Sequence, residues 1–103
     1  MLLIAKVNYI VEKEGRAALL PEHRAYMMQF YQQGKILVSG PFEPADGGLL
    51  IFNVDSKAEL ESIIDGDPFK QNHFYTLEVF EWRLTLGAAD IEALIANRSS
   101  SED

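Results

Sequence analysis

Six segments with strand-like or helical patterns follow one another along most of the chain, and their order restricts the fold more than any other feature. The strand-like segments are rich in apolar and β-branched residues, whereas the helical segments repeat apolar side chains at helical spacing. The predicted strands are Leu2–Val11, Lys35–Phe42, Leu49–Val54 and Phe74–Leu84, and the predicted helices are Pro21–Gln33 and Lys57–Asp65. The order β-α-β-β-α-β predicts an α+β, ferredoxin-like fold, in which two helices cover one face of an antiparallel four-stranded sheet.

Capping and turn residues mark where these elements begin and end. Pro21 suits the first position of a helix, where its missing N–H costs nothing, and Gly34 suits the position after its last turn. Ser56 and Glu59 together form the capping box that begins a helix. The glycine-rich turn at residues 46–48 indicates that the second and third strands pair as an antiparallel hairpin. The buried stripe of the first helix is expected to consist of Leu20, His23, Met27, Phe30 and Tyr31.

Three segments lie outside these six elements. Gly15–Leu20 is expected to be a linking turn, and Ala88–Asn97 a short amphipathic helix. Arg98–Asp103 is polar and is expected to be a loose tail. We therefore divide the chain into a ferredoxin-like domain, residues 1–84, and a C-terminal helix with a disordered tail, residues 85–103.

Both faces of the first and last strands carry apolar side chains. In the first strand Leu3 and Val7 point to one face, but Leu2 and Ile4 on the other face are apolar as well. The last strand repeats this pattern, with Tyr75, Leu77 and Val79 on one face and Phe74, Phe80 and Trp82 on the other. An antiparallel sheet with one solvated face normally alternates apolar and polar residues, and two helices cover only one face. We therefore expect a homodimer that joins through the sheet faces, or a higher homo-oligomer built from it; alternatively, the C-terminal helix folds back over this face.

Composition excludes several classes of protein. The chain has 103 residues and a formal net charge of −7, which argues against nucleic acids and anionic membranes as partners, because both are bound through clustered Lys and Arg. It has no cysteine, which excludes disulfides, thiolate metal ligands and a thiol nucleophile. No apolar run approaches the ~20 residues of a transmembrane helix, and the N-terminus lacks the basic segment of a signal peptide, so a cytoplasmic protein is expected.

Few side chains could carry chemistry. His23 lies on the apolar stripe of the first helix, where it is either a buried core histidine or a general acid/base with a carboxylate neighbour. Asp67, between a glycine and a proline, is either part of a helix stop or that neighbour. Ser39-Gly40-Pro41 ends the second strand and could hold a ligand oxygen or form a bulge, while His73 lies in a polar turn.

The spacing of these residues resembles that of the YciI-like (YCII-related) proteins. The similar motifs are His23 soon after a proline, the strand Leu37-Val38-Ser39-Gly40-Pro41, the turn Asp67-Pro68-Phe69, and a strand that ends in Glu81-Trp82. They cover roughly residues 1–84. The resemblance implies a ferredoxin-like fold of the dimeric α+β barrel superfamily, with a His23–Asp67 dyad in a pocket and Ser39, Gly40 and Pro41 as its substrate-binding neighbours.

Two functions remain open after this resemblance. The first is a small enzyme that needs no cofactor or metal, in which Asp67 orients His23 for proton transfer on a small organic molecule, as in isomerisation, lactone chemistry or elimination. Glycine-rich nucleotide-binding motifs and a histidine metal triad are both missing from the sequence. The second function is a non-catalytic module that binds or senses a small metabolite. The enzyme requires both side chains to open into one concave site, with the imidazole within about 3.5 Å of the carboxylate or of a bridging water.

Overall fold

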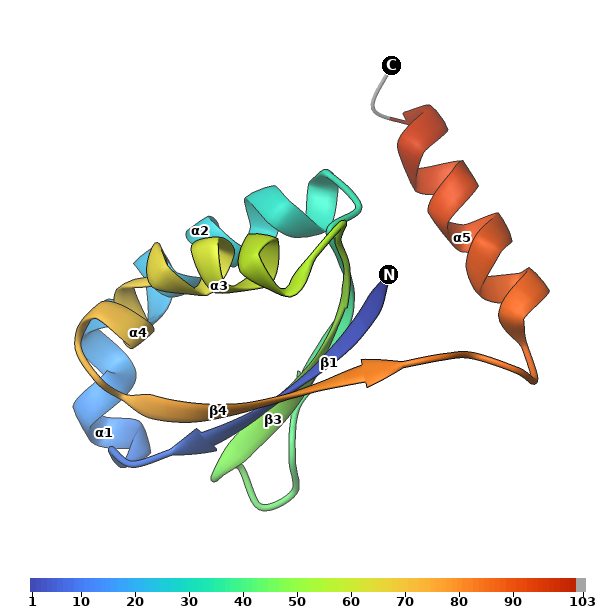
Figure 1. Ribbon diagram of the computed structural model, residues 1–103. Coiled ribbons are helices and arrows are strands. Elements are labelled where there is room, and N and C mark those ends of the chain that lie inside the picture. The colour runs from blue at the N-terminus through green and yellow to red at the C-terminus, as the bar shows by residue number, and fades with distance from the viewer. Residues whose placement is uncertain (102–103) are drawn as a thin grey trace.

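The computed structural model describes the backbone of residues 1–101 and the side chains of residues 1–98. A four-stranded antiparallel sheet forms one layer, and helices α2 and α3 lie together on one of its faces (Figure 1). The elements are β1 (Leu2–Tyr9), α1 (Lys13–Arg16), the 3₁₀ turn η1 (Ala17–Leu19), α2 (Leu20–Gln32), β2 (Ile36–Pro41), β3 (Gly47–Asn53), α3 (Lys57–Asp65), α4 (Pro68–Gln71), β4 (Tyr75–Trp82) and α5 (Ala88–Ser101). This order contains the predicted β-α-β-β-α-β arrangement and confirms the α+β fold.

The strands lie in the order β2-β3-β1-β4, all with antiparallel neighbours. In the centre of the sheet, Ala5 of β1 lies opposite Leu50 of β3 and Val79 of β4. The pairing of β2 with β3 is interrupted at Leu37, where the register shifts by one residue. The bulge in β2 therefore lies before Ser39-Gly40-Pro41 and not within it.

The core lies between the sheet and the helices. Phe52 of β3 and Leu60 of α3 have no exposed surface, and neither has Ala5 of β1. The side of α2 that packs against this core contains Leu20, Tyr26, Met27 and Phe30. Tyr31, which was expected there, is 43% exposed, because Tyr26 rather than Tyr31 lies on the helix face that meets the core.

Short helices account for other differences from the prediction. The expected linking turn before α2 contains the end of α1 and all of η1, and α4 forms a single turn directly after α3. The expected loose tail is helical as far as Ser101, because α5 does not end at Asn97; Glu102 and Asp103 lie outside the described residues. Arg98 fixes this part of α5, since its guanidinium donates hydrogen bonds to the carbonyls of Ile36 and Leu37.

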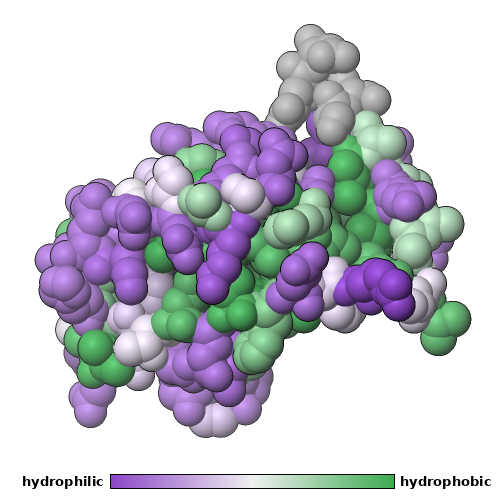
Figure 2. Space-filling model, in the orientation of Figure 1, coloured by the Kyte–Doolittle hydropathy of each residue, from purple (hydrophilic) through white to green (hydrophobic). Residues whose placement is uncertain are grey.

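Helix α5 follows β4, which is one edge strand of the sheet, and its Arg98 contacts β2, which is the other edge strand. The Arg98 guanidinium also lies over the ring of Tyr31, 4.2 Å from its centre. Figure 2 shows that the hydrophobic residues of α5 gather on the side that faces the rest of the chain. Among the described residues, no helix is long and apolar enough to cross a membrane.

The face of the sheet away from α2 and α3, here called the open face, remains apolar and uncovered. Val38 of β2 is 47% exposed, and Phe80 and Trp82 of β4 are 52% and 39% exposed. Ile4 of β1 lies between these strands, opposite both Ile51 of β3 and Phe80. Since α5 leaves these side chains exposed, it does not provide the cover that the sequence pattern requires.

Candidate functional site

Asp67 is the buried centre of the candidate site. It lies in the short turn between α3 and α4, and its residue surface is fully inaccessible to solvent. Its side chain caps α4, because Oδ1 accepts a hydrogen bond of 3.1 Å from the backbone N–H of Phe69. Pro68 follows at the first helical position, where it needs no hydrogen-bond acceptor. The sequence Asp-Pro-Phe thus folds locally into a capped turn that points a carboxylate inward.

His23 contacts this carboxylate from the first turns of α2. Its Nδ1 lies 2.6 Å from Asp67 Oδ1, well within the expected distance. The imidazole stacks on the ring of Phe69, with the ring centres 3.9 Å apart and the planes 3° from parallel. The His23 side chain is 20% exposed, whereas that of Asp67 is 1% exposed. Access from solvent to the dyad is therefore through the imidazole.

Tyr75 of β4 is a third member of the site, which sequence reasoning assigned only to one face of the last strand. Its hydroxyl donates a hydrogen bond of 2.8 Å to Asp67 Oδ2. Burial, the charge of Asp67 and this hydrogen bond together raise the pKa of Tyr75 far above its ordinary value. The only sequence signal for this role was a tyrosine on the helix-facing side of the last strand, close behind Asp67.

Tyr26 lies near the same carboxylate without bonding to it. Its hydroxyl donates to the backbone carbonyl of Ile63 at 2.8 Å. Burial raises the pKa of Tyr26, and the charges of Asp67 and Asp65 raise it further. Both tyrosines therefore stay protonated around neutral pH and act there as donors.

The hydrogen bonds define which atom of the site can react. An ionised carboxylate only accepts hydrogen bonds, so the proton between His23 and Asp67 belongs to Nδ1. The other ring nitrogen, Nε2, then carries the free lone pair. This arrangement is suited to removing a proton from a ligand and stabilising the resulting imidazolium through Asp67.

The other residues of the predicted site lie apart from this pair. Ser39, Gly40 and Pro41 are exposed on β2, which is one edge of the sheet, whereas Tyr75 lies on β4 at the opposite edge. The structure therefore brings His23 and Asp67 together, but two strands, β3 and β1, separate the Ser39-Gly40-Pro41 segment from β4. His73 is exposed in the turn before β4, with a positive φ of 59°.

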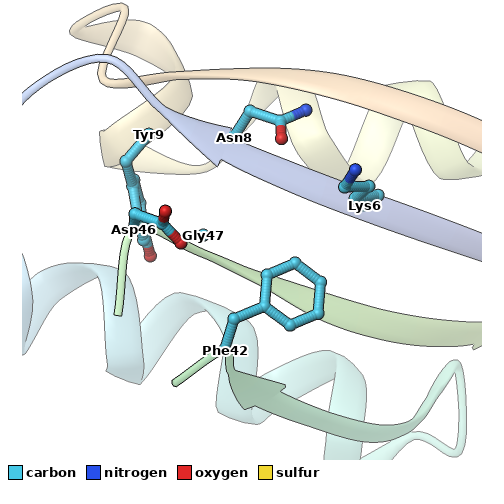
Figure 3. A pocket seen from close by; sticks show the side chains of 6 residues that line it. All are labelled: Lys6, Asn8, Tyr9, Phe42, Asp46 and Gly47. Atoms are coloured by element: carbon cyan, nitrogen blue, oxygen red, sulfur yellow. The ribbon is translucent and has the colours of Figure 1, made fainter. Parts of the chain in front are cut away.

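A cavity of about 520 Å³ opens near the start of β3, and neither His23 nor Asp67 lines it. Figure 3 shows its lining residues, which are Lys6, Asn8, Tyr9, Phe42, Asp46 and Gly47. Tyr9 connects this cavity with the dyad, since its ring packs edge-on against Phe69 and Tyr75 with ring centres 6.3 Å apart in both pairs. The expectation that His23 and Asp67 open together into one concave site is wrong for Asp67, because its side chain is sealed by the donors that surround it.

Within the part of the chain that the structure describes, no three side chains of His, Cys, Asp or Glu gather as a metal site would require. The dyad has one histidine and one carboxylate, and its Asp67 oxygens already accept bonds from Phe69 and Tyr75.

Fold and site together define a small α+β protein with a buried carboxylate that orients a partly exposed histidine. The chain belongs to the YCII-related domain family, whose sequence profile matches residues 1–83. Among solved structures, it is similar to 5-chloro-2-hydroxyhydroquinone dehydrochlorinase from Burkholderia phenoliruptrix AC1100, in complex with 2,5-dihydroxybenzoquinone. The TM-score is 0.71 at 23% sequence identity, over 82% of this chain and 96% of that one. No curated protein matches the chain in sequence.

Proposed function

We propose that this protein is a small enzyme in which His23 transfers a proton on a small organic molecule and Asp67 orients and stabilises the imidazole. The observation that carries the proposal is the 2.6 Å contact between His23 Nδ1 and the fully buried Asp67. A buried carboxylate that keeps its charge requires hydrogen-bond donors, and here it has three. The same three donors leave Nε2 of His23 as the basic atom of the site.

In the proposed reaction, Nε2 removes a proton from an acidic C–H or O–H group of the substrate. The electron pair left on the substrate then forms a new double bond. In an elimination it expels a leaving group such as halide, and in an isomerisation the imidazolium returns its proton at another carbon atom. Asp67 accepts the Nδ1–H bond throughout and takes up no proton. The solved structure with the similar fold is that of a dehydrochlorinase, so elimination is the first reaction class to test.

A non-catalytic binding function is the second candidate, and the cavity of Figure 3 favours it. Aromatic rings of Tyr9 and Phe42, the Lys6 ammonium group and the Asp46 carboxylate line this cavity. Aromatic rings beside polar groups are typical of sites for small molecules, and here the polar groups form the larger part of the lining. A metabolite bound there would contact Tyr9 and not the dyad.

The test uses His23→Asn, because an asparagine amide can replace the Nδ1–H donor to Asp67 but has no counterpart of Nε2. Chlorinated hydroquinones and unsaturated lactones serve as probe substrates, with chloride release or loss of the lactone absorbance as the readout. The unmodified protein should turn over a probe, and the rate of His23→Asn should be about 100-fold or more lower. The matched control, His73→Asn, changes the exposed histidine and should keep full turnover. Equal turnover by His23→Asn and the unmodified protein would refute the enzyme proposal, as would binding of these probes without any turnover.

We also propose that the protein is a homodimer joined through the open face. The exposed apolar residues of β2 and β4 support this, because monomers seldom expose contiguous apolar patches. Phe80→Glu should shift sedimentation from dimer to monomer, since it places a charge among the exposed apolar side chains of that face. Leu86→Glu is the control, because Leu86 is 94% exposed in the connection after β4 and lies outside the sheet. A monomeric unmodified protein, or a dimer that survives Phe80→Glu, would contradict the proposal.

A further inference from the structure

The orientation of the Asp67 carboxylate is fixed from both sides. The last torsion of an aspartate side chain has a broad energy minimum, so a carboxylate is free to turn unless both oxygens are bonded. Here the Phe69 N–H bonds to Oδ1 at 3.1 Å and the Tyr75 hydroxyl bonds to Oδ2 at 2.8 Å. The first donor belongs to the turn that Asp67 caps, but the second comes from the far side, from the sheet. Tyr75 is therefore the contact through which the sheet holds Asp67.

Tyr75 is itself held rigidly. It is 4% exposed, and it pairs with Tyr9 of β1 in the register of the sheet. Its ring also packs edge-on against the ring of Tyr9. Burial and the charge of Asp67 raise the pKa of Tyr75, so that its hydroxyl keeps its proton and remains a donor.

The imidazole has a fixed ring plane for a similar reason. The ring of His23 stacks on Phe69 almost in parallel, and Phe69 follows Asp67 closely in α4. The remaining variable is which ring nitrogen carries the proton, and this is decided by the hydrogen bond that Nδ1 makes. An Asp67 carboxylate that is free to turn would hold that proton less firmly.

We propose that Tyr75 is a positioning residue of the dyad: by anchoring Asp67 Oδ2, it keeps the neutral His23 protonated on Nδ1 and so makes Nε2 the atom that transfers protons. This proposal rests on the function proposed above and adds to it the residue that sets the tautomer. Tyr75 itself touches no reacting atom, because its hydroxyl is bonded to the buried carboxylate. Its loss should therefore act through Asp67 on His23.

The experiment measures the tautomer of His23 by ¹⁵N NMR of histidine-labelled protein without substrate, at a pH where the ring is neutral. The unmodified protein should show the proton on Nδ1. In Tyr75→Phe the ratio of the Nδ1–H to the Nε2–H form should fall about tenfold, which is the effect of one hydrogen bond of ordinary strength. Tyr26→Phe is the matched control, because it removes a neighbouring hydroxyl that bonds to Ile63 and not to Asp67.

Two results would overturn the positioning role. One is an unchanged tautomer ratio in folded Tyr75→Phe, and the other is an equal change in Tyr26→Phe, which would indicate general loosening. If Tyr75→Phe fails to fold, the unmodified protein still decides the point, because His23 protonated on Nε2 refutes the proposal directly. Since no substrate is present, these results are independent of the turnover measurements. A tautomer shift without any turnover would support the role of Tyr75 and refute only the enzyme.

Discussion

Replacing Asp67 separates its contribution to stability from any contribution to catalysis. Asp67→Ala leaves the Phe69 N–H and the Tyr75 hydroxyl buried without an acceptor, and each such group costs about 1–3 kcal/mol. The His23 side chain is 20% exposed, so its Nδ1–H can bond to water instead. The expected loss of unfolding free energy is therefore about 4 kcal/mol, a large part of the 5–15 kcal/mol typical of a small domain.

Asp67→Asn should cost much less. Its amide oxygen can still accept from the Phe69 N–H and from His23, while its NH₂ group faces the Tyr75 hydroxyl oxygen, which can also accept. Only the hydroxyl proton of Tyr75 then loses its acceptor, so we expect a loss of about 1–2 kcal/mol. The unfolding free energy should therefore rise from Asp67→Ala to Asp67→Asn to the unmodified protein, because fewer buried donors lose their acceptor at each step.

The assay is urea unfolding followed by circular dichroism at one fixed protein concentration, because association of two copies would add to the measured stability. Asp65→Ala is the control, since Asp65 is an exposed acid in the same turn and its change should stay within about 0.5 kcal/mol. A loss below about 1 kcal/mol for Asp67→Ala would refute the reasoning, because it would show that the donors around the carboxylate do not need it.

Three further predictions concern the parts of the fold that support the site. Gly34→Ala should lower the unfolding free energy by about 1 kcal/mol in the same urea assay, because Gly34 ends α2 with a φ of +78°. Glu59→Gln should lower the melting temperature at neutral pH but not in acid. A hydrogen bond from the Asp55 N–H chiefly holds the pKa of Glu59 below its usual value of 4.5, so the stabilisation is present above that value and is lost as the pH falls through the folded-state pKa. Arg98→Ala should speed amide hydrogen exchange in α5, which Arg98 holds through Tyr31 and two carbonyls of β2, without changing exchange in β1.

The regular elements could be predicted from the sequence because their patterns are long enough to repeat. The apolar spacing of α2 and α3 extends over several turns, and the Ser56–Glu59 capping box marks the start of α3 at the right residue. Helices of four residues, such as α1 and α4, are too short to show a repeating apolar pattern. Isolated helices of this length are unstable, so they depend on tertiary contacts, which the local sequence does not show. Tyr31 was wrongly expected on the core face next to Phe30, since one position along a helix turns a side chain by a large angle.

The position of Ser39-Gly40-Pro41 depends on the strand order, which motifs along the chain do not reveal. The resemblance to the YCII-related proteins implied that this segment lies in one pocket with His23 and Asp67. In the sheet, however, the hairpin places β2 at the edge farthest from β4, with β3 and β1 between them. Only the strand order decides this, and local patterns contain no information about which edge a hairpin occupies.

Asp67 was expected to be either part of a helix stop or a carboxylate neighbour of His23, and in the structure it is both. A helix stop was the simplest interpretation of Asp-Pro-Phe, and the structure has that stop, with the Asp67 side chain capping α4. The cap is also what aims Oδ1 at His23, and Phe69, the residue whose N–H it accepts, provides the ring on which the imidazole stacks. A single turn thus supplies the carboxylate, its orientation and the surface that fixes the histidine. Local sequence could identify this turn but not its partners, because His23 and Tyr75 reach it from a helix and a strand that only the complete fold brings together.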